Sequence, residues 1–484
     1  MIALTLGDLA EVVGGRLVDG DPDVRVTGPA FLDSRAPEPG GLFVAFVGER
    51  ADGHDHAPGA VEGGAAAVLG SRATGVPTVL VGDTQSALQE LARVVLARRR
   101  ARRTPFTVVA VTGSQGKTTA KDMLARVLAD GAPTVATAGS FNNELGLPLT
   151  VLRTEEETRY LVLEMGARGI GHLAELTAIA PPDVSLVLNV GKAHLGEFGS
   201  QEAIARAKGE LVEALTPEGT AVLNADDRLV IAMRSRTPAR VRTFGTSQDA
   251  DVRLSAVGSD ELGRAVLDLT VEDRTEHVAL RLLGEHQAAN AAAVTATALA
   301  AGRPFEEVCA SLRAIERLSR WRMEVLERPD GLMLVNDAYN ANPDSMRAAL
   351  QTLAGIGRRS GRPTTAVLGA MLELGPASEQ EHRELGTLAH DLGIDRLVVV
   401  GVGAGGVYDA LVEARGEDGS ALRVDTVDEA GEWLRDNVAG PDVVLIKASR
   451  SGRLERVAEL IMRAGSSVAD TRSHDAPAGE ESRR

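Results

Sequence analysis

The sequence predicts an α/β protein of three domains, and three observations support this. Short apolar runs alternate with amphipathic helical stretches, which is typical of mostly parallel sheets covered by helices. The chain has 484 residues, enough for several domains that each bury a core. A glycine-rich turn at residues 112–119 joins a predicted buried strand to a predicted helix, the arrangement of a P-loop-type domain.

The composition excludes several classes of protein. Apolar residues make up 44% of the chain, and no apolar run approaches the ~20 residues that span a bilayer. The N-terminus lacks the basic and apolar regions of a signal peptide. The single cysteine, Cys309, excludes an internal disulfide, and the net charge of −16 disfavours nonspecific binding to nucleic acid. We expect a cytoplasmic monomer with no nucleic-acid partner and no membrane insertion.

The predicted elements fall into three blocks. The first block, residues 1–104, is a small α/β domain with three short strands and a long helix, at 42–47, 65–69, 78–81 and 86–100. The second block, residues 105–317, is predicted to be the P-loop-type domain with a mostly parallel sheet. Its strands are expected at 108–111, 160–163, 184–190 and 219–223, and an alanine-rich helix at 287–301. Residues 251–283 alternate apolar and polar side chains, with turns at Gly258 and Glu272-Asp273, so we predict a small antiparallel sheet there.

The third block, residues 318–464, repeats the strand–helix alternation and is predicted to be a Rossmann-like α/β domain. Its strands are expected at 332–335, 366–368, 397–400 and 443–446, and the polar residues 465–484 are expected to be a disordered tail. The loop Gly401–Gly406 fits the G-x-G-x-x-G pattern of dinucleotide sites, and Asp425 follows roughly 20 residues on. Because this loop follows the third strand of its block rather than the first, we interpret it as an ordinary glycine-rich loop.

Residues 112–119 carry the clearest chemical signal. Gly113 and Gly116 allow a tight turn whose N–H groups face a ligand, and Lys117 opens a helix predicted to end at Ala129. Unpaired N–H groups at a helix start attract phosphate, lysine adds a point charge, and the Thr118 hydroxyl can hold Mg²⁺. Val111 stands where the common pattern has its first glycine, which points to a narrower family than the general P-loop NTPases.

Three further residues are candidates for the same site. Glu164 ends a predicted strand and can bind Mg²⁺, although alone it could be a salt-bridged acid. His194 follows the next strand, and we favour a metal or phosphate role over a structural one. Lys208 lies in a helical stretch and is one of only five lysines among 52 basic residues. In a chain that prefers arginine, a lysine is a candidate for chemistry that guanidinium cannot perform.

In their order along the chain, these motifs resemble the Mur ligase family, the ATP-dependent amide-forming enzymes of peptidoglycan precursor synthesis. The resemblance covers all but the tail, on the segments 112–119, 140–150, 164–166, 189–200, 208–210, 224–227, 284–290, 322–324, 336–346, 368–375 and 447–450. Residues 336–346 and 368–375 are similar to the members that add D-alanyl-D-alanine, and an Asp-Asn-Pro-Arg signature of the preceding step is absent from the sequence. Residues 32–35, 42–46 and 52–54 resemble the UDP-sugar-binding domain of that subfamily.

The resemblance implies a reaction of ATP, UDP-N-acetylmuramoyl-tripeptide and D-alanyl-D-alanine through an acyl phosphate, with Mg²⁺. It implies catalytic roles for Lys117, Glu164, His194 and Lys208, with Lys208 carbamylated by CO₂. Mg²⁺ ligands would be Thr118, Glu164, His194 and Lys208. Nucleotide-binding residues would be Gly113, Ser114, Gly116, Lys117, Thr118, Thr119, Asn290, Arg322, Asp337 and Asn340. Substrate-binding residues would be Ser34, Arg35, Asn143, Lys447, Ser449 and Arg450.

Two departures and three alternatives remain open at this point. The family more often has Asn where this chain has Gln115, and Gly where it has Ala448. The chain could instead be the ligase that adds the third amino acid, a folylpolyglutamate synthase-like enzyme, or a nucleotide-binding switch without catalysis. A lysine at position 208 that simply pairs with Glu210 or Glu213 would also weaken the carbamate hypothesis.

Overall fold

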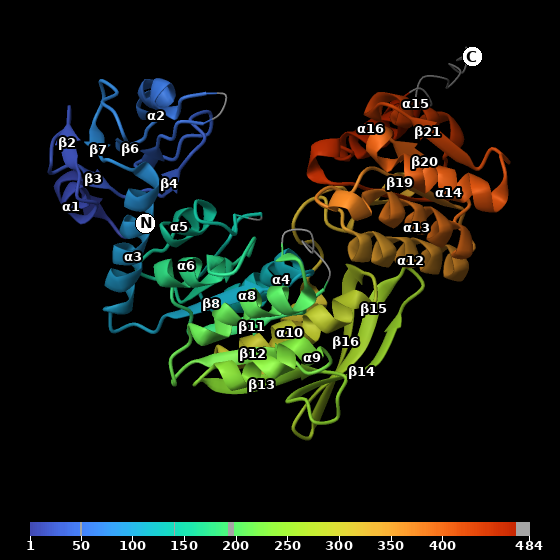
Figure 1. Cartoon of the computed structure of the whole chain (residues 1–484), viewed down its shortest axis with the longest axis horizontal. Helices are drawn as coiled ribbons and strands as arrows, with labels where there is room; N and C mark the ends of the chain where they lie inside the picture. The colour runs from blue at the N-terminus through green and yellow to red at the C-terminus, as the bar shows by residue number, and fades with distance from the viewer. Residues whose placement is uncertain (49–50, 140, 192–197, 471–484) are drawn as a thin grey trace, which may run out of the picture.

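The computed structural model describes residues 1–48, 51–139, 141–191 and 198–470. The chain forms three α/β units, and the first and third lie on opposite sides of the central one (Figure 1). None of the helices in these ranges is long and apolar enough to cross a membrane.

The N-terminal unit contains a five-stranded sheet in the order β2-β7-β6-β5-β4 and a small β1–β3 ladder. Strands β4 to β7 are parallel, and β2 joins the edge antiparallel. Its elements are β1 (Leu4–Thr5), α1 (Leu6–Val12), β2 (Arg16–Val18), β3 (Arg25–Val26), β4 (Ala30–Phe31), β5 (Leu42–Val44), α2 (Ala57–Glu62), β6 (Ala67–Gly70) and β7 (Thr78–Leu80).

Helix α3 (Thr84–Arg100) joins the N-terminal unit to the central one. Its apolar face belongs to a hydrophobic cluster that continues from Leu6 of the first unit to Leu147 and Leu176 of the second. Arg99 is 1% exposed and donates to the carbonyl oxygen of Thr158 at 3.1 Å. The helix is therefore anchored in the core of both units.

The central sheet has nine strands in the order β16-β15-β14-β13-β12-β11-β8-β10-β9. Its parallel strands are β8 (Thr107–Thr112), β9 (Thr134–Ala136), β10 (Tyr160–Glu164), β11 (Val184–Val187), β12 (Thr220–Asn224) and β13 (Arg240–Gly245). The antiparallel strands are β14 (Val252–Ser259), β15 (Arg264–Val271) and β16 (Arg274–Leu283). Because β13 pairs with β14, the predicted antiparallel strands extend the main sheet instead of forming their own. Gly258 lies inside β14 next to a bulge, so the turn predicted there is wrong, whereas the turn at Glu272-Asp273 is confirmed.

Helices cover both faces of the central sheet. Along β8, Val108 and Ala110 pack into one apolar cluster and Val109 and Val111 into the other, because successive side chains of a strand face opposite ways. The helices are α4 (Lys117–Ala129), α5 (Gly146–Val151), α6 (His172–Ile179), α8 (Gln201–Glu213), α9 (Arg228–Ile231), α10 (His286–Ala300) and α11 (Phe305–Ala314).

The C-terminal sheet has the order β17-β18-β22-β19-β20-β21, with β17 antiparallel at one edge. Helices α12 to α14 pack on one face, and α15 and α16 on the other. The strands are β17 (Glu324–Glu327), β18 (Met333–Asp337), β19 (Thr364–Leu368), β20 (Arg396–Val400), β21 (Ala421–Val424) and β22 (Val443–Lys447). The helices are α12 (Pro343–Ser360), α13 (Ser378–Asp391), α14 (Gly405–Arg415), α15 (Val427–Asn437) and α16 (Glu455–Asp470). Helix α16 thus extends into the segment expected to be disordered, up to Asp470.

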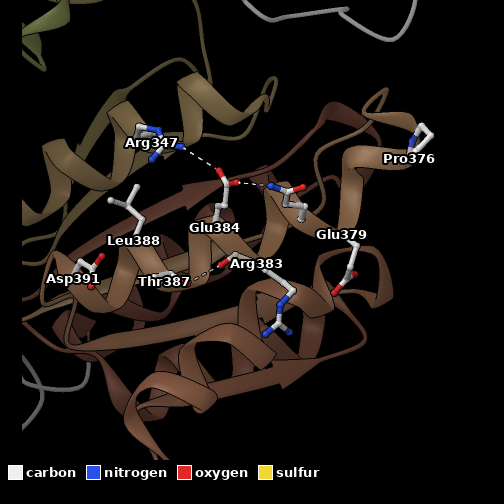
Figure 2. A pocket seen from close by; sticks show the side chains of 9 residues that line it. Arg347, Pro376, Glu379, Arg383, Glu384, Thr387, Leu388 and Asp391 are labelled. Atoms are coloured by element: carbon white, nitrogen blue, oxygen red, sulfur yellow. Dashed lines mark hydrogen bonds and ion pairs between the residues drawn. The ribbon is translucent and has the colours of Figure 1, made fainter.

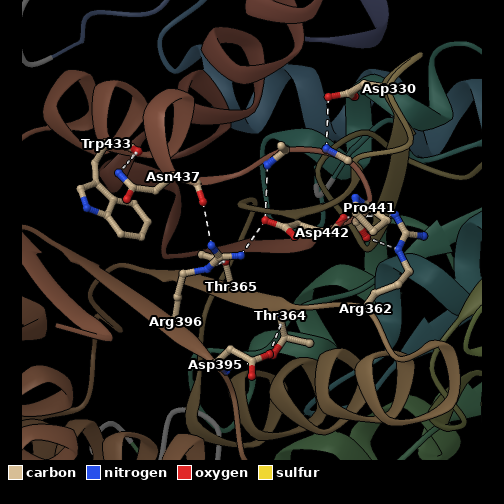
Figure 3. A network of polar contacts seen from close by, with 12 residues as sticks. Asp330, Arg362, Thr364, Thr365, Asp395, Arg396, Trp433, Asn437, Pro441 and Asp442 are labelled. Atoms are coloured by element: carbon tan, nitrogen blue, oxygen red, sulfur yellow. Dashed lines mark hydrogen bonds and ion pairs between the residues drawn. The ribbon is translucent and has the colours of Figure 1, made fainter. Parts of the chain in front are cut away.

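A polar network joins the amino ends of the C-terminal strands (Figure 3). Arg396 donates to Asp442 at 2.6 Å and to the carbonyl oxygen of Asn437 at 2.7 Å. Asp395 accepts from the backbone N–H of Thr364 at 2.7 Å. These contacts stabilise the amino ends of the strands. The carboxyl ends lie on the opposite side of the sheet, where open α/β sheets bind their ligands.

Candidate active site

The glycine-rich loop lies between β8 and α4, at the carboxyl ends of the parallel strands of the central sheet. Gly116 has a φ of +75°, and a Cβ atom there would lie 2.7 Å from Oδ1 of Asn290 on α10. Only glycine meets both constraints without strain. The predicted nucleotide-binding residue Asn290 therefore lies against the loop, and its own amide donates to Gln287 at 2.8 Å.

Asn189 holds this loop in shape. Its Oδ1 accepts from the backbone N–H groups of Ser114 and Gln115, each at 3.0 Å, and its amide donates to the carbonyl oxygen of Gln115 at 3.3 Å. The Ser114 hydroxyl accepts from the backbone N–H of Gly191 at 2.9 Å. The sequence placed Asn189 in a family motif but gave no reason to expect this supporting role.

Lys117 opens α4, and its ammonium donates to the carbonyl oxygen of Gly113 at 2.8 Å. Burial lowers the pKa of Lys117, the Glu164 carboxylate opposes that shift, and Arg322 adds to it. Arg322 therefore lies near Lys117, although 205 residues separate them in sequence number. Thr118 is 4% exposed, and Thr119 follows it in the first turn of the helix.

Glu164 ends β10 beside the loop, with its side chain buried. Its Oε1 accepts from the amide of Asn142 at 2.8 Å, whereas Oε2 is buried without a hydrogen-bond partner. A buried carboxylate oxygen that lacks a partner is costly and calls for an explanation. A divalent cation supplies one, since carboxylate oxygens are its preferred ligands.

Lys208 lies on α8 and is 5% exposed, so it is not a helix-surface lysine. Glu210 accepts from the backbone N–H groups of Gly171 and Ala174, at 2.6 and 3.0 Å. Glu213 pairs with Arg236 at 2.8 Å. The Lys208 amine makes no hydrogen bond or ion pair with another described residue, so the surface-pairing alternative is wrong.

Electrostatics favour the neutral form of this amine. Burial and then the positive charge of Lys117 hold the pKa of Lys208 well below its usual value. His194, the remaining predicted metal ligand, lies outside the described residues. No cluster of three His, Cys, Asp or Glu side chains able to hold a metal occurs among the residues that are described. Of the predicted metal ligands that the structure describes, Thr118, Glu164 and Lys208 are all buried, and Glu164 has an oxygen without a hydrogen-bond partner.

On the C-terminal side, Lys447 ends β22 and Asp337 ends the neighbouring strand β18. The Lys447 ammonium donates to Asp337 at 2.5 Å and to the carbonyl oxygen of Asn340 at 2.9 Å. Asp337 also accepts from the backbone N–H of Met323 at 3.1 Å. Three predicted site residues are thus in direct contact. The Ser449 hydroxyl accepts from the backbone N–H of Leu372 at 3.1 Å.

Two arginines of the C-terminal unit stack on aromatic rings near the linker from the central unit. The Arg322 guanidinium lies 4.2 Å from the ring centroid of Tyr339, and that of Arg450 lies 4.3 Å from Trp321. Arg450 also pairs with Glu455, whose Oε2 is buried without a hydrogen-bond partner. Stacking holds both guanidinium planes in place.

The predicted substrate-binding residues of the N-terminal and central units lie outside the cluster around Lys447. Arg35 is exposed and pairs with Asp33 at 2.8 Å, and Ser34 lies between them in the loop after β4. Asn143 accepts from the backbone N–H of Gly146 at the start of α5, at 2.9 Å. The described contacts do not join Ser34 or Arg35 to the phosphate loop.

Two cavities lie in the C-terminal unit. One of about 670 Å³ lies between α12 and α13, where Arg347, Arg383 and Glu384 line it together with other charged side chains (Figure 2). The other, of about 220 Å³, is lined by Gly401, Gly403 and Asp425. It is smaller than the ~300 Å³ typical of the smallest ligand pockets, which favours the interpretation of Gly401–Gly406 as an ordinary glycine-rich loop.

Comparisons with known proteins identify the family of this chain. Residues 111–298 match the Mur ligase middle domain, residues 321–450 the Mur ligase glutamate ligase domain, and residues 31–103 the Mur ligase family catalytic domain. The chain is 44% identical to a UDP-N-acetylmuramoyl-tripeptide--D-alanyl-D-alanine ligase of Mycobacterium tuberculosis, over 96% of this chain and 98% of the relative. It is 34% identical to the ligase of the same name from Escherichia coli, over 96% and 100%.

Solved structures give the same result. A crystal structure of MurF from Acinetobacter baumannii has a TM-score of 0.81 at 30% identity and covers 95% of this chain and 99% of that one. MurF ligase from Thermotoga maritima, crystallised with ADP, has a TM-score of 0.75 at 31% identity and covers 92% and 99%. Sequence and fold agree along almost the whole chain, and this protein belongs to the Mur ligase family.

Proposed function

We propose that this chain is the ATP-dependent ligase that joins D-alanyl-D-alanine to UDP-N-acetylmuramoyl-tripeptide. The terminal carboxylate of the tripeptide attacks the γ-phosphorus of ATP, ADP leaves, and an acyl phosphate forms. The dipeptide amine then attacks the acyl carbon and expels phosphate, which leaves a new amide bond. The relatives that match nearly the full length at 44% identity carry the name of this activity.

The first step needs positioning and charge neutralisation more than a covalent nucleophile. Lys117 and the N–H groups of residues 113–119 would hold the outer phosphates, with Gly116 admitting the backbone close to them. Asn290 lies against the loop and Arg322 is near Lys117, which supports our proposal that both would close over the nucleotide. The buried, unpartnered oxygen of Glu164 is the observation that most strongly supports a metal-assisted phosphoryl transfer.

Thr118, Glu164, His194 and Lys208 would hold Mg²⁺, which would neutralise charge on the transferring phosphate. We propose that Lys208 is carbamylated for this purpose. The Lys208 nitrogen adds to the carbon of CO₂: a C–N bond forms, one C–O π bond breaks, and the nitrogen loses a proton to solvent. A buried ammonium beside a cation would be repelled, whereas the carbamate supplies oxygen ligands.

In the second step the C-terminal unit would present the dipeptide. Lys447, Ser449 and Arg450 lie at the carboxyl end of β22, where open α/β sheets bind their ligands. Asp337 and the carbonyl oxygen of Asn340 accept hydrogen bonds from the Lys447 ammonium, which fix its position between them. Ser34, Arg35 and Asn143 would contact the UDP-linked substrate. We propose that the enzyme acts as a cytoplasmic monomer.

Phosphate release tests this function. It should require ATP, Mg²⁺, the UDP-linked tripeptide and D-alanyl-D-alanine together. Release with glutamate and a folate substrate would favour a folylpolyglutamate synthase, and a dependence on the amino acid of the third position would favour the preceding ligase. Nucleotide binding without turnover under any of these conditions would favour a switch.

A second experiment isolates Lys208. Lys208→Arg keeps a positive charge but cannot form a carbamate, so it should be inactive. Lys208→Ala should be inactive and partly rescued by short-chain carboxylic acids, which can occupy the vacated oxygen positions. Full activity of Lys208→Arg would contradict the carbamate and leave the ligase assignment intact.

A further inference from the structure

A hydrogen bond links the phosphate loop of the central unit to the C-terminal unit. The side-chain amide of Gln115 donates to Oδ2 of Asp344 at 2.7 Å. Gln115 lies between Ser114 and Gly116 in the loop, and Asp344 lies in the first turn of α12. Both residues are half-buried, so the contact is partly shielded from solvent.

Each end of this contact is held by a rigid backbone. Asn189 both accepts from and donates to the backbone of Gln115. At the other end, a capping box starts α12: Asn342 accepts from the backbone N–H of Ser345 at 2.9 Å, and the Ser345 hydroxyl accepts from that of Asn342 at 3.1 Å. Because other hydrogen bonds support the backbone at both ends, the Gln115–Asp344 hydrogen bond relates the positions of the two units.

The rest of α12 meets the central unit at different places. A Cβ atom on Gly263, in the turn before β15, would lie 2.6 Å from Ile356, and one on Gly284 would lie 3.1 Å from Thr352. The middle and the last part of α12 therefore lie close to the central unit. Gln115 is the contact that holds its first turn, which is the end nearest to the phosphate loop.

The linker between the two units makes a contact of its own. It is tied to the central unit where the Ser319 hydroxyl donates to Asp122 on α4. Together with the parts of α12 that lie against the central unit, a hydrogen bond at the first turn of α12 restricts rotation about this contact. Residues Lys447 and Asp337 lie on the unit whose rotation is restricted, and the phosphate loop lies on the other.

We propose that Gln115 and Asp344 are positioning residues, whose hydrogen bond sets the C-terminal unit over the phosphate loop so that the amine meets the acyl phosphate. The alignment role, which brings the amine to the acyl phosphate, rests on the proposed function. The mechanical role, which fixes the position of the C-terminal unit relative to the phosphate loop, does not. Misplacement of a reacting group by about 1 Å can slow a reaction ~100-fold, so a contact of this kind affects turnover without touching a substrate.

Gln115 suits this contact in length. Asparagine is shorter by one carbon–carbon bond, about 1.5 Å, which would take the donor beyond the ~3.5 Å limit of a hydrogen bond. The backbone contacts with Asn189 do not depend on the side chain and would persist. Gln115→Asn therefore removes the link and keeps the loop.

The mechanical role can be tested without any ligand. Spin labels at the exposed positions Ser235 and Glu417 report the distance between the two units, and Cys309 is buried and should stay unlabelled. Gln115→Asn should broaden the distance distribution. Gln380→Asn is the matched control, because Gln380 donates to Glu384 at 3.1 Å within α13 and should leave the distribution unchanged. An unchanged distribution in Gln115→Asn would overturn the proposal even if the chain is the proposed ligase.

The alignment role is tested by exchanging donor and acceptor. Gln115→Glu places a second carboxylate against that of Asp344, and the two repel each other. This variant should lower kcat at least about tenfold, the size expected when a hydrogen bond to a charged group is lost. Adding Asp344→Asn supplies an amide donor and should restore most of kcat, with each protein first checked for an unchanged thermal unfolding profile. A double variant as slow as Gln115→Glu alone would mean that residue 115 acts only on the nucleotide, and would overturn the proposal.

Discussion

Glu164→Gln is predicted to stabilise the metal-free protein and to abolish turnover. Glu164 is 1% exposed, and its two oxygens differ: one accepts from Asn142 at 2.8 Å, and the other has no partner. Glutamine has nearly the same shape and keeps the acceptor for Asn142. It removes the buried charge, and with it the oxygen that the metal needs.

The expected gain in stability is modest. A buried polar group without a partner costs about 1–3 kcal/mol, and a charged one costs more. The Lys117 ammonium is close enough to Glu164 to offset part of that cost, although the two make no ion pair. We therefore expect a net gain of about 1 kcal/mol, or roughly 2–4 °C in the melting temperature of a domain of this size.

The assay is thermal unfolding of both proteins with and without Mg²⁺ and ATP. Ligand should raise the melting temperature of the wild type, because binding to the folded state stabilises it, and should raise that of Glu164→Gln much less. Glu175→Gln, at an exposed position of α6, is the control and should behave as the wild type. A metal-free Glu164→Gln that melts below the wild type, or one that turns over normally, would refute this reasoning.

Three further predictions concern other parts of the chain. Gly116→Ala should weaken ATP binding in calorimetry and cost more stability than Gly171→Ala, since both have positive φ but only Gly116 meets a neighbour, at 2.7 Å; equal losses would mean that the contact with α10 is unimportant. Arg396→Ala should destabilise the C-terminal unit by about 1–3 kcal/mol in urea and leave kcat near normal, because it breaks contacts at the edge opposite the site; a kcat loss without destabilisation would contradict this. Burial raises the pKa of the Cys309 thiol to about 12, so the folded protein should not react with a thiol reagent at pH 8 until it is unfolded; rapid labelling of the folded protein would show that the thiol is accessible.

Helices and strands could be predicted from the sequence where the pattern that indicates them lies within one segment. The helix predicted at 117–129 is α4, because its apolar positions and the glycine turn before it both lie in the segment. Edge strand β21 (Ala421–Val424) was not predicted, since it is short and only partly buried, and the pairing that forms it lies with β20. Gly258 was predicted as a turn, but pairing with β15 carries the strand through it as a bulge.

The candidate site likewise contains residues that a local pattern predicts and contacts that depend on how distant segments pack. Lys117 and Glu164 could be predicted because each ends or begins an element whose pattern is visible in the sequence. That Glu210 is engaged by α6, and so cannot pair with Lys208, depends on helix packing that no local pattern encodes. The contact of Gln115 with Asp344 joins residues 229 positions apart and could come only from the structure.

The mass of the product is the most direct test of the central claim. Purified enzyme with ATP, Mg²⁺, UDP-N-acetylmuramoyl-tripeptide and D-alanyl-D-alanine should yield one UDP-linked product, whose mass is that of the tripeptide substrate plus the dipeptide less one water. ADP and phosphate should appear in equal amounts, and omission of the dipeptide should prevent product formation. A folded, nucleotide-binding enzyme that leaves the tripeptide substrate unchanged, or that attaches a single amino acid, would contradict the account.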